Sequence, residues 1–262
     1  MKKLIVMMKV FWFFDTNGNN FLLPINMIIG IGISLIFCFD TTWMVLNYLN
    51  KGIIIGFRNS LLMIIPVINL SCIFISINPV ITMWKGKVIG NMNTFLLQAP
   101  ILKKDIYNSR FIIFQFESIP FLIIVIYSLG LSIFVSKSAY ASAYSVFLIL
   151  IYCIWAIAMS ISIGFSSLST KKYHAFRFLP IALMLTALAF MGYLSSIPYV
   201  EPNTLVSAQN MFSYLGPLFI PVLKACSHIS EITGLIIIFA TFLTSYFFSC
   251  KLPLKISEKE GA

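Results

Sequence analysis

Long apolar runs separated by short polar segments dominate the chain. A helix needs about 20 mostly apolar residues to cross the ~30 Å hydrocarbon core of a bilayer. Six runs meet this requirement: residues 21–39, 61–84, 111–135, 143–166, 178–194 and 232–250. The pattern predicts an all-α polytopic membrane protein in which residues 1–262 form a single transmembrane domain.

Two further segments are apolar but unsuited to cross a membrane. Residues 1–15 carry Phe, Trp and Met side chains but are interrupted by Lys9. We expect them to form an interfacial helix, with a frayed start of the first span as the alternative. Residues 194–231 are broken by Gly216 and Pro217, which favours a broken or re-entrant outer segment covered by protein.

Basic residues are distributed unevenly over the two sides of such a protein. With six spans, one side holds only Lys51, Arg58, Lys137 and Lys224, and the other holds the remaining 14 of the 18 Lys and Arg residues. Because the side richer in Lys and Arg faces the cytoplasm, both termini are predicted to be cytoplasmic. The chain is therefore expected to be a multi-pass protein of the cell membrane.

Composition supports this class of protein. Hydrophobic residues make up 60% and charged residues 10% of the 262 residues, and the mean hydropathy is +0.96. These values exclude an ordinary soluble domain. The net charge of +10 is explained by the topology and by attraction to anionic lipid, because the basic residues are dispersed among membrane segments. Nucleic-acid binding is not predicted.

The sequence carries no recognisable catalytic or metal-binding motif. Five scattered cysteines lack C-x-x-C spacing and are read as small apolar residues, without a disulfide framework or a metal site. His174 and His228 fall on opposite sides of the predicted membrane. The phosphate-binding loop G-x-x-x-x-G-K-[ST] is also missing. We therefore expect no catalytic residues and no cofactor bound to this chain, and we do not expect an enzyme.

Two intramembrane features leave alternatives open. Glu117 lies about 9 Å inside the third apolar run, where it is either part of a translocation path or a near-interface carboxylate paired with a basic residue. In the fourth run Ala156, Ser160 and Gly164 recur every four residues, a spacing that lets helices approach closely. This face serves either packing within the chain or contact with a second subunit. Gly30 and Ser34 form a weaker version in the first run.

The insert between the second and third runs, NMNTFLLQAPILKKDIYNSRF, reads as a cytoplasmic elbow. Asn93 and Thr94 are good helix N-caps, and Pro100 turns the chain away from helical geometry. A second helix is expected to begin around Leu102, with Lys103 at the inner surface.

The residues of this elbow resemble ABC-2 type transporter permeases, in which a T-L-x-x-L-L-x-x-P-I/V-S-R-x-x-I stretch follows the second span. The matching stretches are NTFLLQAPI at 93–101, KKDI at 103–106 and SRF at 109–111. The layout is most similar to small bacterial permeases that export, or give immunity to, antimicrobial peptides, lantibiotics, bacitracin and amphipathic peptide toxins. The chain departs from the family pattern where Lys103 and Lys104 replace Ser-Arg.

The resemblance implies an exporter driven by a separate protein. Two permease chains, identical or sister chains, would form the pathway for a hydrophobic or amphipathic peptide, and two cytoplasmic ABC ATPase subunits would bind ATP and Mg²⁺. The elbow would act as the ATPase-coupling helix, through Asn93, Thr94, Leu97, Pro100, Ile101, Lys103, Lys104 and Asp105. The alternatives from other functional classes are an ion-coupled secondary carrier that uses Glu117 and a membrane assembly factor.

Overall fold

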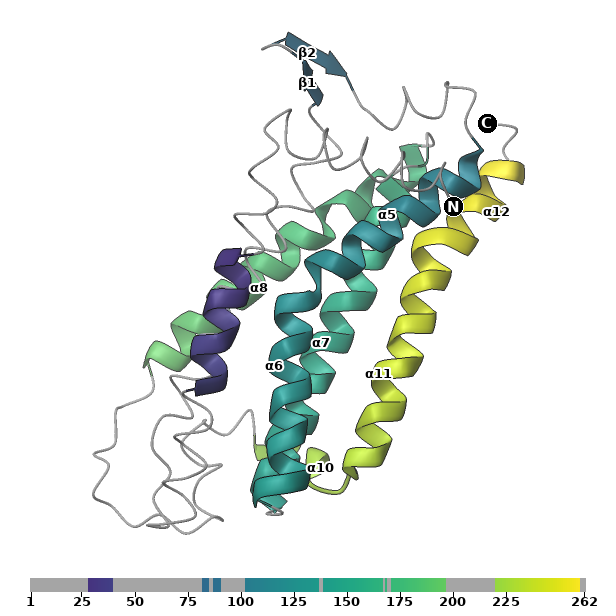
Figure 1. Cartoon of the computed structure of the whole chain (residues 1–262). Coiled ribbons are helices and arrows are strands. Elements are labelled where there is room, and N and C mark those ends of the chain that lie inside the picture. Colours follow the sequence, from purple (N-terminus) through teal and green to yellow (C-terminus); the bar gives the residue numbers. More distant parts are fainter. Residues whose placement is uncertain are drawn as a thin grey trace.

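The computed structural model describes residues 28–39, 82–84, 87–90, 102–136, 139–166, 168, 171–196 and 220–259. This part of the chain is helical apart from one short β-hairpin (Figure 1). The predicted interfacial helix at 1–15, most of the predicted second span and the centre of the outer segment lie outside the described residues.

The described residues include helices long and apolar enough to cross a membrane. Ser142–Phe165 and Glu231–Lys259 meet this test alone, and Lys103–Glu117 with Ile119–Phe134 meet it together as a bent pair. The predicted helical class is thereby confirmed in its coarse form, and two or three candidate spans among the described residues are consistent with a membrane protein. The number of six spans stays a prediction.

The third predicted run forms two helices rather than one straight span. Helix α5 covers Lys103–Glu117 and α6 covers Ile119–Gly130, followed by a π-helical segment η1, Leu131–Ser136. The two α-helices meet at an angle of 52°. Pro120 explains this bend, because its ring has no N–H and clashes with the carbonyl four residues earlier.

Helix α7, Ala139–Ser166, is the central element of the bundle. It contains neither a charged residue nor a proline, so nothing in its sequence interrupts a helix of about 42 Å. It contacts α5, α6, α8, α10 and α11 (Figure 1). A helix over the predicted fourth run, 143–166, is confirmed, and it begins four residues earlier than the sequence suggested.

Shorter apolar helices lie beside this centre. The helix Ile28–Phe39 occupies the second half of the predicted first run. The 3₁₀ segment η2, Lys171–Phe178, leads into α8, Leu179–Ser196, where the fifth run was predicted. At ~1.5 Å per residue α8 is about 27 Å long, slightly less than the hydrocarbon thickness.

The C-terminal part begins with the short helix α10, Ile220–Cys226, and continues into the last long helix. Ser230 caps α11, Glu231–Tyr246, by accepting a hydrogen bond from the Thr233 N–H at 3.2 Å. The helix widens into the π-helical segment η4, Phe247–Lys251, and then forms α12, Leu252–Lys259. Pro253 accounts for the widening, because it cannot donate to the Ser249 carbonyl.

A hairpin stands where the sequence predicted the end of a span. Strand β1, Thr82–Trp84, pairs antiparallel with β2, Lys87–Gly90, through Trp84 opposite Lys87 and Met83 opposite Val88. The predicted end of the second span at residue 84 is therefore wrong. Two short β-compatible stretches separated by two residues, one of them a glycine, are a recognisable hairpin signal.

Candidate coupling site

The elbow predicted from the sequence is described only at its end. Asn93, Thr94, Leu97, Pro100 and Ile101 lie outside the described residues. Lys103, Lys104 and Asp105 form the first turn of α5. Leu102 precedes it in an extended backbone conformation (φ −65°, ψ 124°), so the helix begins at the position predicted. Asp105 lies where a carboxylate interacts favourably with the helix dipole.

From this first turn, α5 runs into the interior alongside the last helix. Tyr107, Phe111 and Phe114 are buried. The Phe111 ring contacts Phe242 and Tyr246 edge-on, with ring centroids 5.4 and 5.3 Å away. One turn earlier, the Cys250 thiol donates to the Tyr107 carbonyl oxygen, with sulfur and oxygen 3.3 Å apart. The elbow therefore leads into a helix that packs against the C-terminal end of α11 and against η4.

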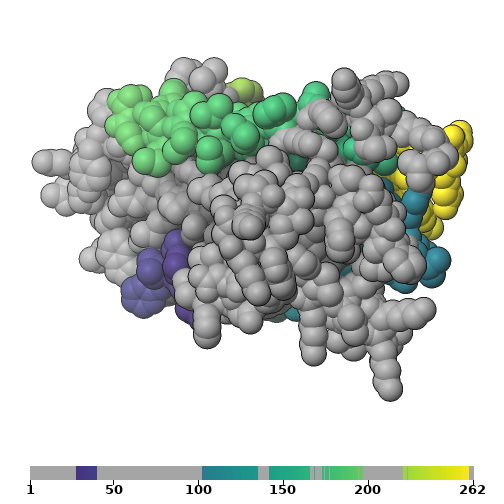
Figure 2. Space-filling view, turned by 90° about the horizontal axis from the view of Figure 1, so that it is seen from above, coloured from purple at the N-terminus to yellow at the C-terminus, as the bar shows by residue number. Residues whose placement is uncertain are grey.

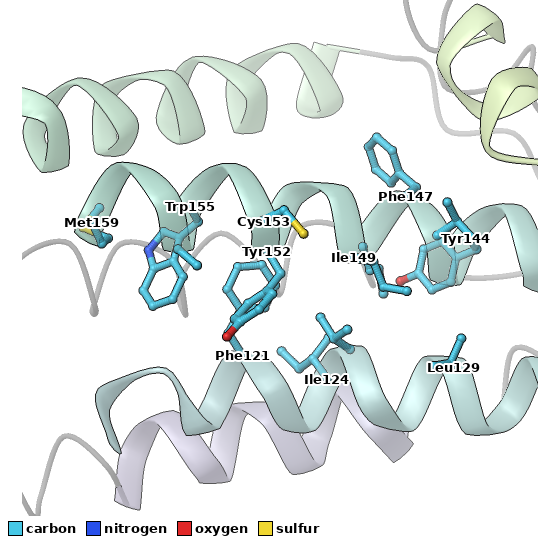
Figure 3. Close-up of a cluster of buried hydrophobic side chains, with 14 of the residues drawn as sticks. Phe121, Ile124, Leu129, Tyr144, Phe147, Ile149, Tyr152, Cys153, Trp155 and Met159 are labelled. Atoms are coloured by element: carbon cyan, nitrogen blue, oxygen red, sulfur yellow. The ribbon is translucent and has the colours of Figure 1, made fainter. Parts of the chain in front are cut away.

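An aromatic cluster links α5 and α6 to α7. Trp155 is 1% exposed, and its ring lies 5.5 Å from Phe114, 5.6 Å from Phe121 and 6.0 Å from Tyr152. Figure 3 shows Tyr152 and Trp155 of α7 pointing toward Phe121 of α6. Because these rings bury large apolar areas on both sides of the bend, the cluster fixes the bend against the central helix.

The bend itself is held by the helix Ile28–Phe39. The Ser34 hydroxyl lies within hydrogen-bond distance of two carbonyl oxygens, those of Pro120 and Gly30, both at 2.8 Å. A Cβ added to Gly30 would lie 3.0 Å from Cγ of Pro120. The weak small-residue pattern noted at Gly30 and Ser34 therefore serves close approach to a proline-bent helix. The spacing of Gly30 and Ser34 in the sequence did not identify Pro120 as their partner.

Glu117 is the last residue of α5 and adjoins the bend. It is partly buried and lies fourteen residues, or about 21 Å, beyond the start of the helix. The predicted depth of about 9 Å was counted from Phe111, where the apolar run begins, and it stays a prediction. The position next to a helix break is therefore the main structural feature of this carboxylate.

The small-residue stripe on α7 lies inside the chain. Ala156 and Ser160 are buried, and a Cβ added to Gly164 would overlap the Phe248 carbonyl oxygen and lie 2.8 Å from Cγ of Pro253. Because Gly164 has no side chain, the widened turn of η4 can pack directly against α7. This contact corresponds to the first of the two predicted uses of the stripe, packing within the chain.

A matching stripe on the last helix was missed by the sequence analysis. Thr241, Ser245 and Ser249 recur every four residues and are all buried. Thr241 donates from its hydroxyl to Cys153 of α7 at 2.9 Å. The same four-residue spacing that identified the α7 stripe would have found this one, because two parallel small-residue faces allow close helix approach.

The opposite end of the bundle is joined by a polar contact. The Ser132 hydroxyl of η1 donates to Glu231 Oε1 at 2.9 Å, which ties the end of α6 to the start of α11. Among the described residues, no group of three or more His, Cys, Asp and Glu side chains could hold a metal ion. In the part of the chain that the structure covers, α5 carries two lysines in its first turn and packs against α7 and η4 beyond it.

Comparison with known proteins gives no relative. No family model matches the sequence, and no curated protein or solved structure matches it either.

Proposed function

We propose that the chain is the transmembrane permease subunit of an ATP-driven ABC exporter. In this proposal, six spans and an interfacial helix form an ABC-2 type domain with both termini in the cytoplasm and a re-entrant outer segment. Two permease chains surround the pathway, and two cytoplasmic ATPase subunits bind ATP and Mg²⁺. The chain itself binds no nucleotide and performs no catalysis.

One observation supports the proposal best: α5 connects the elbow directly to the buried core. Its first turn carries Lys103 and Lys104, and its interior end carries Phe114, which contacts Trp155. A displacement of the elbow would therefore be transmitted along a 15-residue helix to the bend and to α7. This is the mechanical connection that a coupling helix needs.

The substrate class follows from the resemblance of the elbow to peptide-exporting permeases. Amphipathic or antimicrobial peptides, or other hydrophobic compounds, would be moved out of the cell. Exposed apolar side chains on α11, such as Ile232, Ile236 and Phe239, fit a surface in contact with lipid.

The proposal is tested by co-purification and by ATP hydrolysis. The chain is co-expressed with any ABC ATPase that is encoded beside it, and ATPase activity of the reconstituted complex is measured with and without candidate peptides. We expect a stable complex and stimulated hydrolysis. Failure to co-purify with such an ATPase would overturn the proposal.

The coupling role of the elbow needs its own variants. Leu97→Asp and Pro100→Ala should abolish stimulated hydrolysis while the protein remains in the membrane. Lys224→Gln, an exposed position on α10, serves as the matched surface control. Stimulation that persists in both elbow variants would argue against a coupling helix.

Glu117 keeps a second candidate function open, that of an ion-coupled carrier. Its place at the helix break of a candidate span favours this alternative, because polar groups at such breaks often line ion paths. Glu117→Gln should then abolish gradient-driven transport without any ATPase. In an ABC permease, the same variant should retain peptide-stimulated hydrolysis. A membrane assembly factor would show neither activity.

A further inference from the structure

Lysines from two distant parts of the sequence meet at the inner end of the bundle. The first turn of α5 contributes Lys103 and Lys104, and the end of the last helix contributes Lys251, Lys255 and Lys259. Figure 2, viewed from this end, shows α12 in yellow beside the start of α5, and Figure 1 agrees. We call these five lysines, together with the exposed Leu102, the inner basic patch.

The patch is held in place by packing beneath it. Lys251, Lys255 and Lys259 are exposed and recur every four residues, so they follow one face of the helix. Pro253 and Ser257 of the same helix are buried. Contacts of α12 with α5 and α7, and the Cys250–Tyr107 hydrogen bond one residue before Lys251, fix the two parts relative to each other.

The charge at this end is strongly positive. Among the described residues of these two segments, five lysines stand against two carboxylates, Asp105 and Glu258, and Glu260 follows in the sequence. Such a cluster directly beyond a membrane-spanning helix attracts anions of the inner leaflet.

Depth relative to the bilayer indicates which anion fits. The last apolar run ends at residue 250, so Lys251 lies at the edge of the hydrocarbon core. Lys255 follows ~6 Å and Lys259 ~12 Å further along the axis. The headgroup layer is roughly 5–7 Å thick on each side, and long lysine side chains can bend back toward it. Lys251 and Lys255 are therefore at the level of lipid phosphates.

Leu102 favours lipid over an acidic protein surface. Its side chain is 68% exposed beside Lys103 and Lys104. An exposed leucine next to ammonium groups suits the membrane interface, where the apolar side chain enters the acyl region and the charges meet phosphate.

We propose that the inner basic patch binds the headgroup of an anionic phospholipid. The ligand class is a glycerophospholipid of net negative charge, held between the start of α5 and α12. Lys251 and Lys255 contact its phosphate. This binding does not require the ATPase of the proposed function, so either proposal can fail in its own test, although both place this end of the bundle in the cytoplasm.

The test measures lipid selectivity of the full chain in a nonionic detergent. Dioleoylphosphatidylglycerol and dioleoylphosphatidylcholine are titrated separately, and bound lipid is counted by native mass spectrometry. Each lysine near an anionic surface contributes about fivefold to binding. We therefore expect clear preference for phosphatidylglycerol, and about 25-fold weaker binding by the double variant Lys251→Gln/Lys255→Gln. Added salt should reduce the preference.

Lys224→Gln is the matched control, because Lys224 is an exposed lysine on α10 outside the patch. It should bind phosphatidylglycerol as the wild type does. Circular dichroism and elution volume check that each variant is folded, and if the double variant is not, the wild-type comparison of the two lipids still decides.

Several results would overturn the proposal. The wild type would bind the two lipids equally, or Lys224→Gln would lose as much phosphatidylglycerol binding as the double variant. Full competition by soluble glycerol 3-phosphate would indicate a small phosphate site instead of a lipid site. Lysine-dependent binding of a polyglutamate peptide without lipid selectivity would indicate an acidic protein partner.

Discussion

The hydroxyl of Ser34 lies 2.8 Å from the carbonyl oxygen of Pro120, although the two residues are 86 positions apart in the sequence. Ser34 is fully buried, and the carbonyl belongs to the residue that bends the third apolar run. A proline in a membrane helix leaves a backbone carbonyl without its helical hydrogen bond, and a Ser or Thr side chain of a neighbouring helix can donate to such freed carbonyls. The helix Ile28–Phe39 therefore acts as a brace for the bend between α5 and α6.

Removing this hydroxyl should weaken the fold. Ser34→Ala is expected to lower the free energy of unfolding by about 1 kcal/mol, because an interhelical hydrogen bond is lost. Ser128→Ala is the matched control, since Ser128 is also buried but donates within its own helix to Ile124 at 2.8 Å. Its loss should change the free energy by a few tenths of a kcal/mol. Unfolding in detergent measures both values, and equal losses would contradict the brace.

Two glycines offer a second comparison. Gly164→Ala places a methyl group against the Phe248 carbonyl and Pro253, and overpacking of this kind costs about 1–3 kcal/mol. Gly192→Ala has nothing within 4 Å of the new Cβ and lies in a helix, where alanine is favoured by up to ~1 kcal/mol. We expect the thermal midpoint to fall for the first variant and to stay or rise for the second. The opposite order would exclude the close contact of α7 with η4.

The length of the apolar runs was sufficient to predict the long helices. Uninterrupted apolar sequence specified α7 and α11, because in lipid only a helix or a closed barrel satisfies the backbone. The start of α5 near Leu102 was also predicted, from the proline at 100. These features depend on residues close together in sequence.

The partners of each helix could not be predicted in the same way. Two contacts show this: Ser34 lies against Pro120, and Gly164 lies against the Phe248 carbonyl. Both depend on which helices become neighbours. Sequence spacing shows that a helix face consists of small residues, but it does not show which helix packs against that face. The strand Thr82–Trp84 was not predicted for another reason: hydropathy alone does not separate a short apolar strand from the end of an apolar helix.

The thiol of Cys226 should react slowly with alkylating reagents. Cys226 is 1% exposed in α10, and burial raises its pKa above the ordinary value. Less thiolate is then present at neutral pH, so the alkylation rate should keep rising to higher pH than for an exposed cysteine. The comparison is Ala225→Cys in a Cys226→Ser background, because Ala225 is exposed on the same helix. Labelling rates measured from pH 6 to 10 should differ most at low pH; identical profiles would contradict burial of Cys226.

Sidedness of the two ends can be tested with an impermeant maleimide. Lys224 precedes the last long helix and Lys255 follows its π-helical segment, and both are exposed. With the five native cysteines replaced, Lys224→Cys should be labelled in intact cells, whereas Lys255→Cys should be labelled only after the membrane is opened. The reason is the uneven distribution of basic residues, which places the lysine-rich end in the cytoplasm. Labelling of Lys255→Cys in intact cells would show that this end lies outside the cell. It would then contradict both the binding of inner-leaflet lipid and the docking of a cytoplasmic ATPase at the elbow. Labelling of both positions in intact cells would instead show that Glu231–Lys259 does not cross the membrane.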